Sequence, residues 1–185
     1  NHDIEKAKFY LKFFRNVMAY KVFPKASDGV IIAAIDRSVD PNGDGDFSDK
    51  ADIMSVSLGG PGNPDDSLSI AVDVAVEAGV VAVIAAGNSG PKEQTIGSPG
   101  TARKAITVGA TFRNNPFIAS FSSKGPVIWE GGTLVKPDIT APGSSIYSTV
   151  PSRSYFLCTP SGYKSVSGTS VAAPHISGTA ALMLQ

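Results

Sequence analysis

The sequence predicts an α/β fold in which helices cover a mostly parallel β-sheet. Two observations predict this class. Val80–Ala85 and other short apolar runs have the continuous hydrophobic character of strands that are buried on both faces. These runs alternate with stretches of helical period, and a β-α-β-α-β order indicates parallel strands joined by right-handed crossovers. A length of 185 residues suits one domain with a substantial core.

Hydrophobic periodicity and turn signals place the individual elements. Helices are expected over Ser27–Val39, from Asp65 or Asp66 to Ala78, and over the alanine-rich Val171–Gln185. Either aspartate can cap the second helix, and Gly79 is suited to end it. Strands are expected at Asn16–Phe23, Asp52–Leu58, Val80–Ala85, Ala105–Ala110, Phe117–Ser122 and Ile146–Val150.

The first fifteen residues differ from the rest of the chain. In Asn1–Arg15, apolar residues at helical spacing are interleaved with lysines and an arginine. The pattern predicts a short helix, either an ordinary surface helix or a basic amphipathic helix for a membrane or a partner. We therefore divide the chain into an atypical segment, residues 1–15, and one domain, residues 16–185.

Composition excludes several classes of function. Sixteen basic and sixteen acidic residues cancel, so nothing indicates a nucleic-acid partner. The single cysteine, Cys158, excludes an intrachain disulfide framework and a multi-cysteine zinc site. No apolar run is long enough to span a membrane, and no secretory signal is recognisable after Asn1. The oligomeric state is not predicted.

The run S-G-T-S-V-A-A-P-H-I-S-G, Ser167–Gly178, places a hydroxyl at the start of an apolar helix. There Ser170 would lie among unpaired backbone N–H groups at the positive end of the helix dipole, where an oxyanion is stabilised. Gly168 leaves room for a substrate backbone, and Pro174 cannot donate a hydrogen bond to the carbonyl of Ser170. The alternative interpretation is a core helix with an ordinary Ser/Thr cap.

Two further loops follow buried strands and should lie near Ser170, because ligands of parallel sheets bind outside the carboxyl ends of the strands. In Ser57–Gly60, the two glycines carry no side chain that would block an extended peptide from pairing with the backbone. In Ala85–Gly90, Asn88 occupies a tight, glycine-flanked turn. Taken alone, Asn88 is typical of an ordinary turn residue.

Together these runs closely resemble the subtilisin-like serine proteases, the subtilases. The run around Ser170 resembles the nucleophile motif, and further runs resemble other family motifs in the same order: S-L-G-G, A-A-G-N-S-G, T-I-G-S-P-G, A-S-F-S-S-K-G-P and K-P-D-I-T-A-P-G. The resemblance covers Asn16 to Gln185. It implies the C-terminal two-thirds of a catalytic domain: a three-layer, doubly wound, mostly parallel sheet with helices on both faces, its N-terminal part missing.

The resemblance also assigns roles to individual residues. Ser170 is implied to be the nucleophile, and the side-chain amide of Asn88 would form the oxyanion hole with the backbone N–H of Ser170. The partner is implied to be an extended polypeptide, whose pocket has Gly97 at its base; this glycine would leave room for a large apolar side chain. Substrate-binding residues implied by the family are Ser57, Leu58, Gly59, Ala85, Ala86, Gly87 and Gly97. Ser98-Pro99 is a candidate cis bond.

A serine nucleophile needs a base and an acid group that orients the base. In the family these lie in a D-[TS]-G run and an H-G-T-H run, and neither occurs here. The chain has two histidines. His175 lies about 140° around the helix from Ser170 by helical geometry, and His2 resembles nothing in the family.

Two hypotheses follow from the missing runs. Either the chain is an incomplete serine endopeptidase that acts through an acyl-serine intermediate, or it is a degenerate, inactive subtilase that serves as a peptide-binding or structural module. Family habit implies an extracellular location.

The acidic segment Asp40–Asp52 resembles the opening of a calcium loop, with oxygen ligands at alternating positions before a glycine. The twelfth position, where a glutamate is expected, holds Ala51. We expect a structural calcium ion, because clustered carboxylates repel one another without a cation. The alternative is a solvated acidic loop that needs no ion. Candidate ligands are Asp40, Asn42, Asp44, Asp46 and Asp49.

Overall fold

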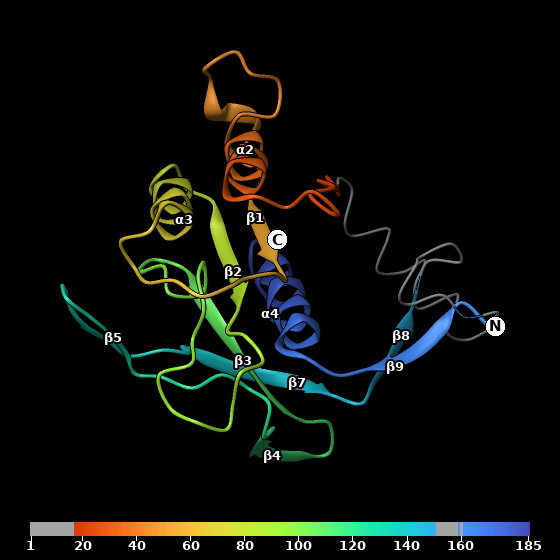
Figure 1. Cartoon of the computed structure of the whole chain (residues 1–185). Helices are drawn as coiled ribbons and strands as arrows, with labels where there is room; N and C mark the ends of the chain where they lie inside the picture. The colour runs from red at the N-terminus through yellow and green to blue at the C-terminus, as the bar shows by residue number, and fades with distance from the viewer. Residues whose placement is uncertain (1–16, 151–158, 160) are drawn as a thin grey trace.

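The computed structural model describes residues 17–150, 159 and 161–185, and its centre is a mostly parallel sheet (Figure 1). β1 (Ile53–Val56), β2 (Val81–Ala85) and β3 (Ile106–Phe112) run parallel in that order. β7 (Ile139–Ser144) continues the parallel arrangement beside β3, and β4 (Asn115–Ile118) pairs antiparallel with the end of β3. The predicted α/β class is therefore confirmed.

Helices cover both faces of this sheet (Figure 1). α2 (Asp28–Val39) and α3 (Ser67–Glu77) share one apolar cluster with the side chains of β1 and β2 that face them. On the other face, α4 (Thr169–Met183) buries Ala172 and Ala173 against Val83, Val108 and other small residues. This packing is the predicted three-layer, doubly wound arrangement.

The boundaries of α2 and α3 lie close to the predicted ones, and Asp66 is one of the two predicted caps. Ser27 caps α2, its hydroxyl accepting a hydrogen bond from the amide of Val30 at 3.4 Å. At α3 the cap is Asp66, whose carboxylate accepts from the amide of Ser69 at 2.8 Å. Gly79 follows this helix with a φ of 95°, a conformation that favours glycine at a helix end.

The predicted strand over residues 16–23 is wrong. Residues 17–23 form no strand, because none of the described strands lies beside them to accept and donate backbone hydrogen bonds. The segment is held instead by side chains: Val22 packs against the core under α2, and the hydroxyl of Tyr20 donates to the carbonyl of Arg37 at 2.8 Å. Asn16 itself lies outside the described residues.

The strand predicted over residues 117–122 begins earlier, as β4, and ends at Ile118. The side chain of Ser122 then bonds the amide of Ala110 at 3.0 Å, which fixes this loop against β3. The sequence pattern does not predict β7, since Pro142 and Gly143 interrupt it. Proline is tolerated there because β7 pairs with β3 alone among the described strands.

Two hairpins and a short 3-10 helix complete the described chain. η1 (Phe47–Asp49) precedes β1, and β5 (Val127–Trp129) pairs with β6 (Gly132–Leu134). β8 (Ile146–Thr149) and β9 (Tyr163–Val166) form an arm that extends away from the sheet beside the start of α4 (Figure 1).

The helix expected over residues 1–15 and the thiol of Cys158 both lie outside the described residues. Within the described part, no helix is both long and apolar enough to cross a membrane.

Candidate active site

Ser170 lies on the first turn of α4, where the sequence predicts it. Gly168 occupies the N-cap and provides no side-chain hydrogen bond to the helix. Among the described residues, the backbone N–H of Ser170 has no hydrogen-bond partner. An unpaired N–H at a helix N-terminus is a donor for an anion, so the backbone here suits a developing oxyanion.

Ser57 and Ser170 are joined by reciprocal hydrogen bonds. The hydroxyl of Ser57 donates to the carbonyl of Ser170 at 2.9 Å, and the hydroxyl of Ser170 donates to the carbonyl of Ser57 at 3.3 Å. Pro174 lacks the N–H that would otherwise bond the carbonyl of Ser170 within the helix. The hydroxyl of Ser57 takes that place and ties the start of α4 to the end of β1.

The side chain of Asn88 is anchored on Thr169, a contact that sequence reasoning missed. The Oδ1 atom of Asn88 accepts from the backbone amide of Thr169 at 2.9 Å and from its hydroxyl at 3.2 Å. The same hydroxyl accepts from the amide of Gly87 at 3.1 Å. Because Oδ1 is held by Thr169, no hydrogen bond to a described residue occupies the Nδ2 donor of Asn88. This donor lies beside Gly168, since a β-carbon built on Gly168 would be 3.6 Å from Nδ2.

The three loops predicted to bind a peptide also meet in the structure. The amide of Gly60 donates to the carbonyl of Ser98 at 2.9 Å in an isolated antiparallel bridge. The amide of Gly97 donates to the carbonyl of Ala86 at 3.3 Å. Residues 95–100 are therefore bonded both to residues 57–60 and to residues 85–87. The Ser98-Pro99 bond within this segment is cis.

Gly97 is required by the close approach of two backbones. A β-carbon at this position would lie 2.6 Å from the carbonyl oxygen of Gly60. We expect Gly97→Ala to lower the free energy of unfolding by about 1–3 kcal/mol, the usual cost of overpacking. Gly29→Ala is the control, because it meets no atom within 4 Å inside α2 and should be neutral or stabilising. Equal losses in denaturant titrations of the two variants would contradict this account.

Comparison with known proteins agrees with this geometry. A family model described as the Subtilase family matches residues 13–185. The chain belongs to the subtilase family. Among curated relatives, the serine protease AprX of Bacillus subtilis (strain 168) is 41% identical over 190 residues, covering 92% of this chain and 42% of AprX. Subtilisin DY of Bacillus licheniformis is 42% identical over 135 residues, covering 72% of this chain and 42% of that protein.

Two solved structures resemble this subtilase chain as well. The S41 psychrophilic protease superposes with a TM-score of 0.66 at 34% identity, covering 85% of this chain and 50% of that one. Sphericase superposes with a TM-score of 0.65, also at 34% identity, covering 85% of this chain and 49% of its own. This subtilase chain thus spans about half the length, or less, of these relatives.

No described histidine contacts Ser170 in this subtilase chain. His175 is exposed, and its Nδ1 atom lies 2.9 Å from the carbonyl of Val171 in the same helix. The hydroxyl of Ser170 bonds a backbone carbonyl instead. His2 lies outside the described residues. Among the described residues, the Ser170 hydroxyl thus lies beside the unpaired backbone N–H of Ser170 and has no hydrogen bond to a histidine.

The acidic loop after α2 is closed by its own backbone. The carboxylate of Asp40 accepts from the amides of Gly43 at 2.7 Å, Asp44 at 3.2 Å and Gly45 at 2.9 Å. These hydrogen bonds, that of Gly45 foremost, hold the pKa of Asp40 below its usual value. The carboxylates of Asp44 and Asp46 likewise accept from the loop.

The described acidic side chains of this loop are not gathered around one point. Within them, no three Asp, Glu, His or Cys side chains are grouped so that they could hold a metal ion. Calcium binding by this loop stays a prediction.

A thermal test decides that prediction. If calcium binds, a chelator lowers the melting temperature, and Asp44→Ala abolishes the difference between melting curves with and without chelator. Asp36→Ala, an exposed carboxylate in α2, is the control and should retain the difference. If the chelator leaves the wild-type melting curve unchanged, the prediction that this loop binds calcium is wrong, and the loop is held by its own amide hydrogen bonds alone.

Proposed function

We propose that this chain is the serine-bearing part of a serine endopeptidase that hydrolyses peptide bonds through an acyl-Ser170 intermediate. The observation that carries the proposal is the anchoring of Asn88 on Thr169, beside the unpaired backbone N–H of Ser170. Two donors then lie at the start of a helix that also bears a hydroxyl. Relatives that are named proteases over most of this chain support the same reaction.

In the proposed reaction, the Ser170 hydroxyl oxygen attacks the carbonyl carbon of a peptide bond and loses its proton to a base. The carbonyl oxygen becomes an anion that accepts hydrogen bonds from Asn88 Nδ2 and the backbone N–H of Ser170. Collapse of this intermediate breaks the C–N bond, and the amine leaves with the proton from the base. Water then releases the acyl group by the same steps. No described residue supplies the base, so the proposal assigns it, with its orienting carboxylate, to residues outside the described part.

The substrate is proposed to be an extended polypeptide. Exposed backbone at Ser57 and Gly59 offers an edge on which such a chain can add as a strand. The small residues Ala86, Gly87 and Gly97 around the proposed pocket favour a large apolar residue just before the scissile bond. One relative, 43% identical over 112 residues, is named a minor extracellular protease of Bacillus subtilis (strain 168), which supports an extracellular location.

Fluorophosphonate labelling tests the proposal. This reagent reacts with serines that have been activated by a base. We expect this polypeptide alone to remain unlabelled, and a longer product of the same gene that contains both family motifs to be labelled stoichiometrically at Ser170. Ser170→Ala should abolish that labelling. Stoichiometric labelling of the polypeptide alone would refute the claim that its base lies elsewhere.

A second candidate is a module that binds extended peptides without cleaving them. The observation in its favour is that the Ser170 hydroxyl donates to the backbone of Ser57 and to no described histidine. A longer gene product that binds peptides but leaves Ser170 unlabelled would establish this alternative over the endopeptidase.

A further inference from the structure

Trp129 is the last residue of β5 and packs beside residues assigned to the peptide pocket. Its ring packs against a cluster formed by Ala86, Ile96 and Val127. Ala86 belongs to one proposed wall of the pocket, and Ile96 precedes Gly97 at the proposed base. The apolar part of the indole therefore packs against the cluster that contains one residue of that wall and one neighbour of the base.

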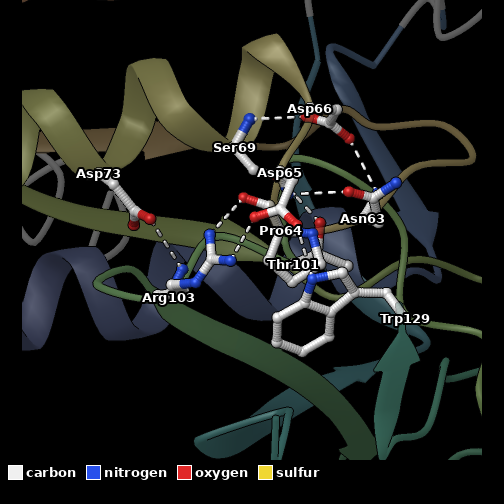
Figure 2. Close-up of polar contacts among 9 residues, drawn as sticks. All are labelled: Asn63, Pro64, Asp65, Asp66, Ser69, Asp73, Thr101, Arg103 and Trp129. Carbon is white, nitrogen blue, oxygen red and sulfur yellow. Dashed lines mark hydrogen bonds and ion pairs between the residues drawn. The ribbon is translucent and has the colours of Figure 1, made fainter. Parts of the chain in front are cut away.

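The polar edge of the same indole reaches the loop that follows residues 57–60, which form the other proposed wall of the pocket. Figure 2 shows Trp129 and Arg103 both directed at Asp65, within the loop that connects β1 to α3. The indole Nε1 donates to Asp65 Oδ2 at 2.7 Å, and Arg103 forms an ion pair with Asp65 Oδ1. The guanidinium carbon also lies 5.2 Å from the centroid of the Trp129 ring, within range of a cation–π contact.

Additional contacts hold this loop in place. Arg103 donates to the carbonyl of Pro64 at 2.6 Å, and the hydroxyl of Ser98 donates to Asp66 at 2.8 Å. The donors around Asp65, Arg103 first and Trp129 second, hold the pKa of its carboxyl below the usual value. Asp65 is therefore charged at neutral pH, as its ion pair with Arg103 requires.

The β5–β6 turn is shaped around the indole. A β-carbon on Gly131 would lie 2.5 Å from Trp129 Nε1 and 3.3 Å from Asp65 Oδ2. The glycine thus lets the turn pass directly over the polar edge of the ring. Trp129 is the single tryptophan in the chain, and it joins segments that are far apart in the sequence.

We propose that Trp129 is a positioning residue that determines specificity, because it fixes the distance between the two walls of the peptide pocket. Its indole N–H binds Asp65, which follows the wall formed by residues 57–60. Its ring packs against the cluster that contains Ala86 of the other wall and Ile96 next to the base. This inference rests on the proposed peptide-cleaving function. The hydrogen bond, the cation–π contact and the apolar cluster of Trp129 involve neither Ser170 nor Asn88, so in this proposal it acts through the walls and not on the reacting atoms.

Hydrogen exchange tests the positioning role directly in this chain. The amides of Gly60 and Gly97 form the bonds that join the walls to the base. We expect Trp129→Ala to speed exchange at both by about tenfold or more, equivalent to about 1.4 kcal/mol of local stability. Trp129→Phe, which keeps an apolar ring but loses the N–H, should have a smaller effect. Phe117→Ala removes an exposed aromatic of β4 and is the control. Unchanged exchange at Gly60 and Gly97 in Trp129→Ala would overturn the proposal.

Peptide selectivity tests the specificity role separately. The probes are two N-acetylated tetrapeptides that end in Phe or in Ala and are otherwise identical. The quantity measured is the ratio of the dissociation constants of the two peptides. We expect the wild-type chain to bind the Phe peptide more tightly. In Trp129→Ala this ratio should fall at least fivefold, and in Trp129→Phe it should be partly restored. An unchanged preference would overturn the specificity role. If the wild-type chain bound neither peptide, the proposed peptide site would be refuted, while the exchange data would still show whether Trp129 joins these loops.

Discussion

Asn88→Leu is expected to reduce kcat for a peptide amide by about 10²–10³-fold in the catalytically complete protein. This magnitude is the one measured for removal of an oxyanion donor in subtilisin, which belongs to the same family, and we carry it over to this chain. The structural reason is twofold. Leucine removes the Nδ2 donor, and it leaves the amide of Thr169 without the acceptor that Asn88 provides. An unpaired buried donor costs about 1–3 kcal/mol, so this variant should also be less stable.

Asn88→Asp separates these two effects. Its carboxylate keeps an oxygen that accepts from Thr169, so the free energy of unfolding should remain within about 1 kcal/mol of wild type. The oxygen that replaces Nδ2 cannot donate, and its charge repels an oxyanion, so the rate should fall at least as far as in Asn88→Leu. An Asn88→Asp variant that cleaves peptides at nearly the wild-type rate would exclude Asn88 from the oxyanion hole.

Asp138→Ala is expected to lower the free energy of unfolding by about 3 kcal/mol, because it removes the carboxylate paired with a buried ammonium group. The Lys136 side chain is 1% exposed, and its Nζ donates to Asp138 Oδ2 at 2.7 Å and to the carbonyl of Ala105 at 2.6 Å. Asp138 also accepts from the amide of Thr107 at 2.7 Å, where β3 begins. Because Asp138 is 41% exposed, water compensates part of the loss, and we take the lower end of the usual range.

Asp138→Asn is the matched variant. Its amide oxygen still accepts from Lys136, so we expect a smaller loss of about 1–2 kcal/mol. Asp36→Ala, an exposed carboxylate in α2, should change stability by no more than about 0.5 kcal/mol. Urea titrations measure all three. The interpretation fails if Asp138→Ala and Asp36→Ala are equally stable.

The sequence predicts those elements whose signals are local. Ser27 and Asp66 precede helices, and each side chain bonds an amide only three residues later. Val81–Ala85 is a continuous apolar run, as expected for a strand such as β2 that is covered on both faces. Ser170 could be placed on the first turn of α4 because Gly168 and the following apolar run define the start of that helix.

Features that depend on distant partners could not be predicted in the same way. Residues 17–23 have the composition of a strand but no described partner strand, whereas β7 contains Pro142 and is a strand because β3 pairs with it. The bond between Asn88 and Thr169 joins residues 81 positions apart. The contact of Trp129 with Asp65 spans 64 positions. A G-T-S run offers a hint of the role of Thr169, but nothing near Trp129 indicates its partner.

The central claim is that Ser170, Asn88 and the backbone of residues 57–60 form one site for acylation by an extended peptide. A crystal structure of the catalytically complete protein with a peptide boronic acid tests it most directly. We predict a covalent bond from boron to Ser170 Oγ and a boronate oxygen within hydrogen-bond distance of Asn88 Nδ2 and the Ser170 amide. The peptide should pair antiparallel with residues 57–60. A boronate attached to another residue, or a peptide bound away from residues 57–60, would contradict the account.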